Sequence, residues 1–281
     1  MNPKTINRTE TPKVCLTIAG VDPSGGAGII ADIKTFARFG CFATAAIASL
    51  TFQNTTGVFG AVHQTAETIR GQVEPILQDY AVNALKTGML PTAEIIEEVA
   101  RLVKENDLQN FVVDPVVRST SGYDLIDDAA LESLKKLFPL ARVVTPNIPE
   151  AERLAGFKIA SEGDIERAAR RIQSFGAQNV LIKGGHISIL DLGLRIADLE
   201  ESKSRKARDF LFEGEKLTIY EADFYETTAT HGTGCTLAAA ITANLALGKS
   251  LTEAVETAKN FVNEAIRTAP QLGKGHSPIN I

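Results

Sequence analysis

VCLTIAGVDPSGGAG, residues 14–28, followed by IIADIKTFARF, residues 29–39, is the stretch that decides the fold. The apolar run Val14–Ala19 ends at a glycine, which is typical of a short buried strand. A glycine-rich loop follows it, and residues Ala27–Phe39 then show the period of a helix. The apolar side chains of that helix fall on one face: Ile29, Ile33 and Phe36. The stretch therefore predicts a strand, a loop and a helix in succession.

The same alternation continues along the chain. Strands that alternate with helices predict a mostly parallel sheet with helices on both faces, which is an α/β fold. We expect one domain over residues 14–281, a disordered polar N-terminus over residues 1–13, and an exposed charged insertion at Ile187–Arg208. The predicted strands are Val14–Ala19, Phe42–Leu50, Val82–Thr87, Phe111–Asp114, Arg142–Thr145 and Val180–Lys183. The predicted helices are Ala27–Phe39, Glu67–Tyr80, Thr92–Lys104, Asp128–Leu137, Glu162–Phe175, Thr233–Leu247 and a last helix opened by the capping box Ser250-x-x-Glu253.

Composition excludes several classes of protein. The chain has 281 residues, 44% of them hydrophobic, and a net charge of −5, which argues against a nucleic-acid partner. Its three cysteines are widely spaced and predict a reducing compartment with neither a disulfide framework nor a structural zinc site. No signal peptide or membrane-spanning run is visible, so we expect a cytoplasmic enzyme without a membrane partner.

The sequence His231-Gly232-Thr233-Gly234-Cys235 precedes an apolar helix. Such a turn presents unpaired backbone N–H groups and the positive end of the helix dipole, so it favours a bound anion. Cys235 stands at the start of the helix, where the pKa of a thiol falls readily. An anion site beside a titratable group indicates phosphoryl transfer. The alternative is an ordinary helix start with a packed thiol.

Other reactive side chains follow predicted strands, whose carboxyl ends meet at one edge of a parallel sheet. Asp114 ends one strand, and Glu150 lies just after another; together they could hold a hydrated Mg²⁺ that bridges phosphates. Lys183 ends a further strand and could reach a phosphate. Each residue alone is more often a turn former, a helix cap or a surface charge. Met89 fits either the core or a pocket wall.

A dinucleotide site is the competing interpretation of the first glycine loop, because Gly26–Ala31 fits the pattern GxGxxA. That site needs an acidic residue about 20 positions further on to hold a ribose. The chain has no acidic residue between Asp32 and Glu67. Gln53, near the end of the second strand, suits the edge of a neutral heteroaromatic ring instead. No GxxxxGK[ST] pattern is present, which excludes a P-loop.

Taken together, these motifs resemble the hydroxymethylpyrimidine/phosphomethylpyrimidine kinases of thiamine biosynthesis, in the ribokinase-like superfamily. The resemblance runs nearly end to end through AGVDPSGGAG, ADIKTF, FQNTTG, KTGML, VDPV, TPNIPEA, KGGH and HGTGC. It implies a three-layer ribokinase-like sandwich, ATP and Mg²⁺ as cofactors, and a homodimer. The implied reactions are ATP-dependent phosphorylation of 4-amino-5-hydroxymethyl-2-methylpyrimidine and of its monophosphate to the pyrophosphate.

The resemblance also implies a role for each matching residue. Gly232, Thr233 and Gly234 would form the anion hole, with Lys183 near the phosphates. Asp114 and Glu150 would support Mg²⁺. Cys235 occupies the position where sugar kinases of the superfamily carry an aspartate base, so it would accept the hydroxymethyl proton or else orient the hydroxyl. The pyrimidine pocket would use Gly20, Asp32, Gln53 and Met89.

Two other functions stay open at this point. A pyridoxal kinase uses the same scaffold on another ring that bears a hydroxymethyl group, and one ring edge discriminates weakly between the two. A catalytically idle pyrimidine sensor would bind the ring and release no ADP. The chain departs from the family pattern at Val116–Ser119, at Thr51 and in the longer Ile187–Arg208 stretch.

Overall fold

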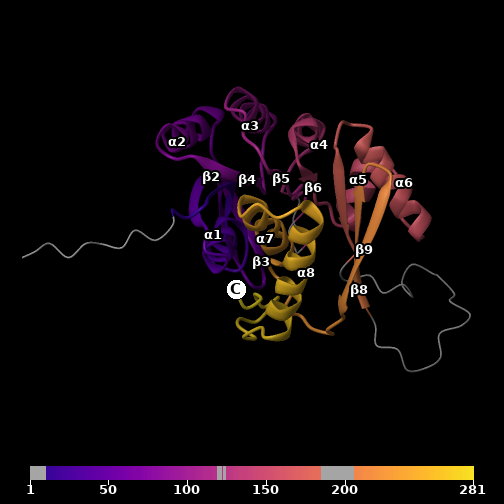
Figure 1. Cartoon of the computed structure of the whole chain (residues 1–281). Coiled ribbons are helices and arrows are strands. Elements are labelled where there is room, and N and C mark those ends of the chain that lie inside the picture. The colour runs from indigo at the N-terminus through magenta and orange to yellow at the C-terminus, as the bar shows by residue number, and fades with distance from the viewer. Residues whose placement is uncertain (1–10, 119–121, 123–124, 185–205) are drawn as a thin grey trace, which may run out of the picture.

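The computed structural model of the chain describes residues 11–118, 122, 125–184 and 206–281. Within these residues, nine strands form one sheet in the order β3-β2-β1-β4-β5-β6-β7-β8-β9 (Figure 1). The strands from β2 to β7 in this order run parallel, while β3, β8 and β9 pair antiparallel with their neighbours. The strands are β1 Val14–Val21, β2 Phe42–Asn54, β3 Gly57–His63, β4 Val82–Thr87, β5 Phe111–Val113, β6 Val143–Val144, β7 Asn179–Lys183, β8 Lys206–Glu213 and β9 Lys216–Asp223.

Helices cover both faces of this sheet, so the architecture has three layers (Figure 1). The helices α2 to α6 pack on one face, and α1, α7 and α8 pack on the other. Their bounds are α1 Gly28–Arg38, α2 Ala66–Asp79, α3 Ala93–Glu105, α4 Asp128–Leu134, α5 Ile148–Ala155, α6 Glu162–Gln173, α7 Thr233–Ala246 and α8 Leu251–Arg267. A 3₁₀ helix at Lys135–Leu140 follows α4.

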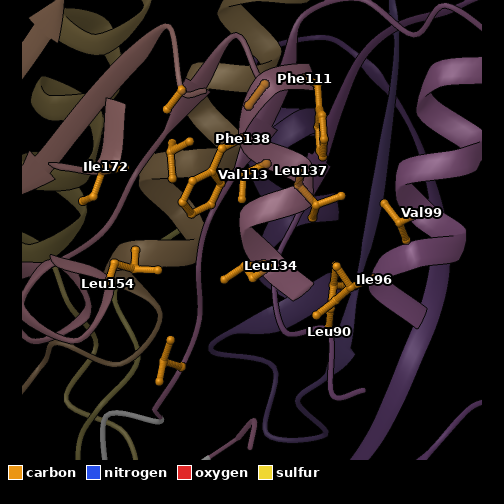
Figure 2. Packing of buried hydrophobic residues seen from close by; sticks show 14 of the residues in the cluster. Leu90, Ile96, Val99, Phe111, Val113, Leu134, Leu137, Phe138, Leu154 and Ile172 are labelled. Carbon is orange, nitrogen blue, oxygen red and sulfur yellow. The ribbon is translucent and has the colours of Figure 1, made fainter. Parts of the chain in front are cut away.

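The larger apolar core lies between the sheet and α2 to α6. Phe138, from the 3₁₀ helix, is fully buried beside Val113 of β5, and Leu154 of α5 belongs to the same cluster (Figure 2). The opposite core has Leu237 and Ile241 of α7 against the other face of the sheet. Central strands such as β1 are therefore buried on both sides, which explains why their sequence is mostly apolar.

The predicted alternation of strands and helices is confirmed, with several differences. Asp128–Leu137 is a shorter helix followed by a 3₁₀ turn, because Pro139 lies just beyond it. The antiparallel strands β3, β8 and β9 and the helix α5 were not predicted. The prediction for residues 1–10 and 187–205 lies outside the described residues. At the end of the predicted insertion, residues 206–208 are not a loop but the start of β8, which pairs with β7 and β9.

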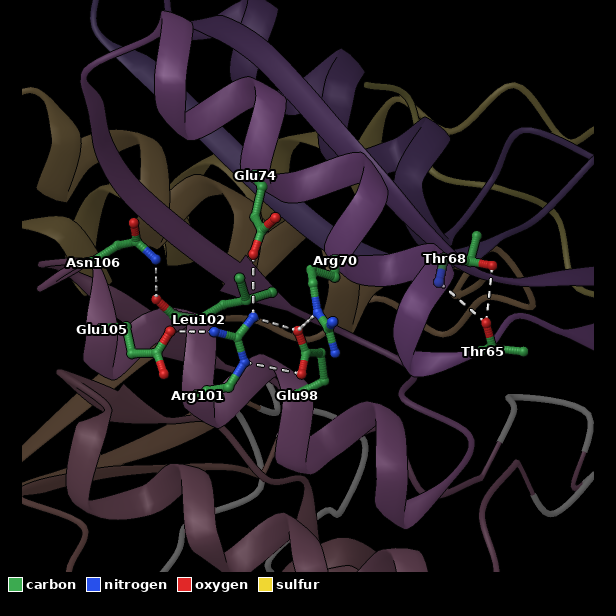
Figure 3. Close-up of polar contacts among 9 residues, drawn as sticks. All are labelled: Thr65, Thr68, Arg70, Glu74, Glu98, Arg101, Leu102, Glu105 and Asn106. Atoms are coloured by element: carbon green, nitrogen blue, oxygen red, sulfur yellow. Dashed lines mark hydrogen bonds and ion pairs between the residues drawn. The ribbon is translucent and has the colours of Figure 1, made fainter.

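Charged side chains join α2 and α3 on the outer surface. Glu98 accepts hydrogen bonds from Arg70 and Arg101, and Arg101 also contacts Glu74 and Glu105 (Figure 3). Glu98 is buried while both arginines are partly exposed to solvent, and ion pairs with solvent-exposed partners contribute little stability each. None of the helices in the described part of the chain combines the length and the apolar content that a membrane crossing needs.

The strand order reverses at β1, because β2 continues from it on one side and β4 on the other. In open α/β sheets, ligands bind at such a switch point, beyond the carboxyl ends of the strands. The loops that follow β1 and β4 meet there, and α7 makes contacts with both strands. This topology fixes where a site can form.

Candidate active site

A cavity of about 1190 Å³ opens at the carboxyl ends of the parallel strands. Its lining comes from segments far apart in the sequence, because the sheet gathers the ends of β1, β2, β4, β5 and β7 at one edge. The lining residues include Gly20, Asp22, Gln53, Met89, Asp114, Glu150, Lys183, His231, Gly232, Thr233, Gly234 and Cys235. Of the predicted site residues, the lining lacks Asp32 alone.

The N-terminus of α7 faces this cavity without a side-chain cap. Gly232 is the N-cap and has φ +85°, and a Cβ there would overlap the carbonyl oxygen of Gly26. Only glycine therefore allows the two loops to meet. The Thr233 hydroxyl donates to the carbonyl of Thr230 at 3.0 Å, which closes the turn. The first N–H groups of a helix have no partner within it, so this turn can receive an anion.

Cys235 lies in the first turn of α7, but its thiol differs from the sequence expectation. Burial, opposed by Lys86 and helped by the nearby carboxylates of Asp114 and Asp32, raises the pKa of Cys235 to about 11. Burial disfavours the charged thiolate more than the positive charge of Lys86 favours it. The thiol therefore stays protonated at neutral pH in the free protein.

Lys183 and Asp114 form an ion pair across the strand ends. Lys183 Nζ lies 2.8 Å from Asp114 Oδ1, and the hydroxyl of Thr145 donates to the same oxygen at 3.1 Å. The two side chains are 12% and 2% exposed. Burial opposes the charged form of the lysine, but Asp114 and Glu150 raise the pKa of Lys183 above its ordinary value. The lysine is therefore charged, and both side chains line the cavity.

Glu150 belongs to the first turn of α5, where Asn147 caps the helix. The Asn147 side chain accepts from the backbone N–H of Glu150, and the Glu150 carboxylate accepts from the backbone N–H of Asn147, both at 2.8 Å. This capping box holds the carboxylate at the cavity wall. Burial raises the pKa of Glu150 to about 7, despite the opposing charge of Lys183. A divalent cation would favour its ionised form.

Gly20, Gln53 and Met89 all line the cavity. A Cβ on Gly20 would lie 3.1 Å from the sulfur of Met89, so the glycine leaves room for that side chain. Met89 is 7% exposed, and Gln53 is half-buried near the end of β2. One amide and one thioether beside bare backbone make a surface suited to a flat ring with a polar edge.

Asp32 differs from the other predicted substrate residues. Its side chain is fully buried on α1, where Lys86 Nζ lies 2.8 Å from both carboxylate oxygens and the Thr17 hydroxyl donates at 2.7 Å. Burial opposes the charged form of the lysine, but Asp32 raises the pKa of Lys86. The structure therefore places Asp32 behind the cavity wall and not in it.

Several lining residues were missed by the sequence analysis. Asp209 on β8 and Lys259 on α8 form a buried ion pair, with Lys259 Nζ 2.7 Å from Asp209 Oδ2. Asp22 binds His231 at 2.7 Å. A charged residue in an otherwise apolar helix stripe was the one available signal for Lys259, because its neighbours Ala258 and Val262 are core residues. The other contacts depend on the tertiary structure.

The arrangement combines a helix N-terminus, a lysine and two carboxylates around one space. Within the described residues, no group of three histidine, cysteine or acidic side chains could hold a metal ion unaided. Two carboxylates are nevertheless the usual protein share of a magnesium site that phosphates and water complete. The chemistry that these groups support is transfer of a phosphoryl group.

Comparison with known proteins agrees with this geometry. The family model described as phosphomethylpyrimidine kinase matches residues 22–280. A relative from Bacillus subtilis (strain 168), hydroxymethylpyrimidine/phosphomethylpyrimidine kinase, is 43% identical over 266 residues, which cover 94% of this chain and 93% of the relative.

Solved structures show the same fold. The ADP complex of Bacillus subtilis pyridoxal kinase has a TM-score of 0.83 at 37% identity, covering 96% of this chain and 97% of that one. The pyridoxal kinase from Staphylococcus aureus in complex with AMP-PCP and pyridoxal has a TM-score of 0.82 at 35% identity, covering 96% and 94%. The predicted ribokinase-like fold is confirmed by these neighbours. With a matched region that includes nearly the whole cavity lining, the chain belongs to the phosphomethylpyrimidine kinase family.

Proposed function

We propose that this protein is a kinase that transfers a phosphoryl group from ATP to 4-amino-5-hydroxymethyl-2-methylpyrimidine and then to its monophosphate. The observation that carries the proposal is the uncapped N-terminus of α7, which faces the same cavity as Lys183 and as the Gln53 and Met89 ring surface. Membership of the family supports the substrate class. The product pyrophosphate would serve thiamine biosynthesis.

The pyrimidine would rest on the surface that Gly20 and Met89 form together, with the Gln53 amide at its polar edge. An amide both donates and accepts, as an aminopyrimidine edge requires. The hydroxymethyl group then points toward Cys235 and the α7 N-terminus, since all of these residues line one cavity. Asp32 supports the cavity wall from behind and does not contact the ring, because its carboxylate accepts hydrogen bonds from Lys86 and Thr17.

In this scheme, most of the rate enhancement comes from stabilising the negative charge on the transferred phosphoryl group. The backbone N–H groups of Gly232 and Gly234 bind the negative oxygens of the transferred phosphoryl group, and Lys183 adds a positive charge. The N–H of Thr233 donates to the carbonyl of Thr230 at 3.3 Å and would join them only by giving up that bond. Cys235 orients the acceptor hydroxyl as a neutral thiol, because burial keeps its pKa near 11. A thiolate acting as general base is the alternative that this pKa disfavours.

Magnesium fits the two carboxylates at the cavity wall. Asp114 and Glu150 would hold the ion through its water ligands and the phosphates of ATP. The bound ion would neutralise charge on those phosphates. The half of the cavity lined by Lys183, Asp209 and Lys259 lies next to these carboxylates and suits the nucleotide.

Pyridoxal phosphorylation is the second candidate function. The pyridoxal kinases of Bacillus subtilis and Staphylococcus aureus share the fold at 37% and 35% identity. Pyridoxal also carries a hydroxymethyl group on a flat ring with a polar edge, so the same wall could receive it. The identity of the ring must therefore be tested directly.

The test is ATP-dependent release of ADP in the presence of Mg²⁺ with three acceptors in parallel: the hydroxymethylpyrimidine, its monophosphate and pyridoxal. We expect turnover of both pyrimidines at a higher kcat/KM than that of pyridoxal. A preference for pyridoxal would move the protein to the second function. Binding of the pyrimidine without ADP release would instead favour a sensor.

We propose a homodimer in the cytoplasm, where ATP is available. The β2–β3 ribbon carries apolar side chains that a second copy could cover, because Phe52 and Phe59 are 55% and 69% exposed. Light scattering on the purified protein would measure the mass of the assembly. A monomeric mass at micromolar concentration would contradict this proposal.

A further inference from the structure

Asp22 is a buried carboxylate for which the scheme above has no role. It is 1% exposed and follows β1 directly. Its Oδ1 accepts from the backbone N–H and the hydroxyl of Ser24, at 2.8 and 2.6 Å. Its Oδ2 accepts from the backbone N–H groups of Gly26 and Ala27, at 3.2 and 2.8 Å. These bonds fix the shape of the glycine loop at residues 22–28.

One more hydrogen bond links Asp22 to the other end of the chain. His231 Nε2 donates to Asp22 Oδ2 at 2.7 Å. The ring is almost buried, and the backbone N–H of His231 donates to the carbonyl of Ser277 at 3.2 Å. Burial opposes ionisation of the carboxyl, but the hydrogen bonds from His231 and Ser24 hold the pKa of Asp22 below its usual value. The carboxylate is therefore charged and bridges two loops.

The two loops also touch closely on either side of this bond. A Cβ on Gly26 would lie 2.5 Å from Cδ2 of His231, and a Cβ on Gly232 would overlap the carbonyl oxygen of Gly26. Neither loop can move toward the other, and the hydrogen bond opposes their separation. The position of residues 231–234 is thus set by the loop at residues 22–28.

We propose that Asp22 and His231 are positioning residues that hold the N-terminus of α7 at the distance phosphoryl transfer requires. They act through the turn at Gly232–Gly234, which must hold the transferred phosphoryl group next to the acceptor hydroxyl that Cys235 orients. A displacement of about 1 Å in such a constellation can reduce the rate about 100-fold. The inference deepens the proposed function and rests on it for the identity of the acceptor, whereas the link between the loops is independent of the acceptor.

The test compares three variants of the full chain. His231→Leu removes the donor, and His231→Gln restores an N–H donor at a similar distance from the backbone. Ser24→Ala is the matched control. It removes a hydroxyl that donates to the same carboxylate, but Ser24 is exposed and lies outside the cavity lining. We expect His231→Leu to lower kcat about 100-fold with KM values for ATP and pyrimidine within about threefold. His231→Gln should recover to within about tenfold of the wild type, and Ser24→Ala should stay within about twofold.

A second measurement needs no substrate. Hydrogen–deuterium exchange of the free protein should show faster exchange in residues 232–236 and 24–28 for His231→Leu, with residues 232–236 unchanged in Ser24→Ala. Unchanged exchange in His231→Leu, or a His231→Gln variant as slow as His231→Leu, would overturn the inference. If the wild type phosphorylates none of the acceptors while the exchange pattern appears, the proposed function fails and the link between the loops stands.

Discussion

Lys183 Nζ lies 2.8 Å from Asp114 Oδ1, although the two residues end strands that are not neighbours. The strand β6 runs between β5 and β7, and the hydroxyl of Thr145, directly after β6, donates to the same carboxylate oxygen at 3.1 Å. One carboxylate therefore joins the ends of three adjacent strands. The charge of Lys183 is fixed at the cavity wall by this network, and its position does not depend on a flexible loop.

The variant Lys183→Met tests whether that fixed charge acts in catalysis. It removes the positive charge and keeps most of the length, so we expect kcat to fall by about 100-fold or more. It also leaves Asp114 buried without its partner, which should cost about 3 kcal/mol of stability. ADP-release kinetics and thermal unfolding measure the two effects. Lys183→Arg keeps the charge and is the control; equal kcat values for the two variants would contradict the role.

The fold could be predicted from the sequence where strands are buried on both faces. The strand Phe111–Val113 is a continuous apolar run, and the structure buries all of it. The edge strand β3 was missed because it contains Gly57 and Gly60 and is largely exposed, so it lacks that signal. The helix α5 was missed although Asn147 and Glu150 form its capping box, because a short helix gives little periodicity.

The site could be predicted where residues follow strands, because parallel strands bring their carboxyl ends together. It could not be predicted where contacts or electrostatics depend on the tertiary structure. The bond between Asp22 and His231 joins residues 209 positions apart and has no local pattern. The thiol of Cys235 stands at a helix N-terminus, yet burial beside carboxylates determines its pKa.

The neutral thiol of Cys235 predicts the outcome of its replacement. If the thiol only orients the acceptor hydroxyl, Cys235→Ser should keep kcat within about tenfold of the wild type, whereas loss of a general base costs about 100-fold or more. The measurement is kcat with saturating ATP and pyrimidine. A loss of about 1000-fold would restore the assignment of a catalytic base.

Alkylation of the free protein tests the same pKa without turnover. Cys15 and Cys41 are buried, so Cys235 is the cysteine most open to iodoacetamide. With a pKa of about 11, few molecules carry the thiolate at pH 8. Since weaker acids give more nucleophilic thiolates, we expect a net rate about tenfold below that of a free cysteine. The rate should continue to rise with pH above 9; a plateau near pH 8 would show a lowered pKa.

Replacement of Gly232 tests the contact between the two glycine loops. Gly232→Ala places a Cβ against the carbonyl oxygen of Gly26 and should abolish measurable turnover. Gly248, at the other end of α7, has φ +86° and no atom within 4 Å of a Cβ position. Gly248→Ala therefore meets no steric clash, and its only penalty is the left-handed backbone conformation, which costs about 1 kcal/mol of stability. This variant should keep its activity. Equal activities of the two variants would mean that the loops can separate without harm.

Replacement of the Glu150 carboxylate should change the magnesium requirement of the enzyme. Glu150→Gln keeps the shape of the capping side chain and removes the charge, so the Mg²⁺ concentration for half-maximal activity should rise about tenfold. The control is Glu152→Gln, on the same helix, whose carboxylate contacts Lys158 and the backbone N–H of Ile159. Titration of ADP release with MgCl₂ at constant free ATP measures both. An unchanged magnesium requirement in Glu150→Gln would exclude the carboxylate from the metal site.

The pair of Asp32 and Lys86 supports the wall of the cavity from behind, and its removal should affect stability first. Both side chains are fully buried, so Lys86→Met leaves an uncompensated carboxylate and should lower the free energy of unfolding by about 3–5 kcal/mol. The double variant Asp32→Leu, Lys86→Met removes both charges and should recover most of that loss, because a buried ion pair is roughly equivalent to apolar residues of similar volume. Denaturant unfolding measures the stability. The KM for the pyrimidine distinguishes a pair that only supports the cavity wall from residues that contact the substrate. A double variant with wild-type stability and a KM within about threefold would establish a supporting role, because loss of a direct hydrogen bond to a charged group costs about 1.5–3 kcal/mol, or more than tenfold in affinity.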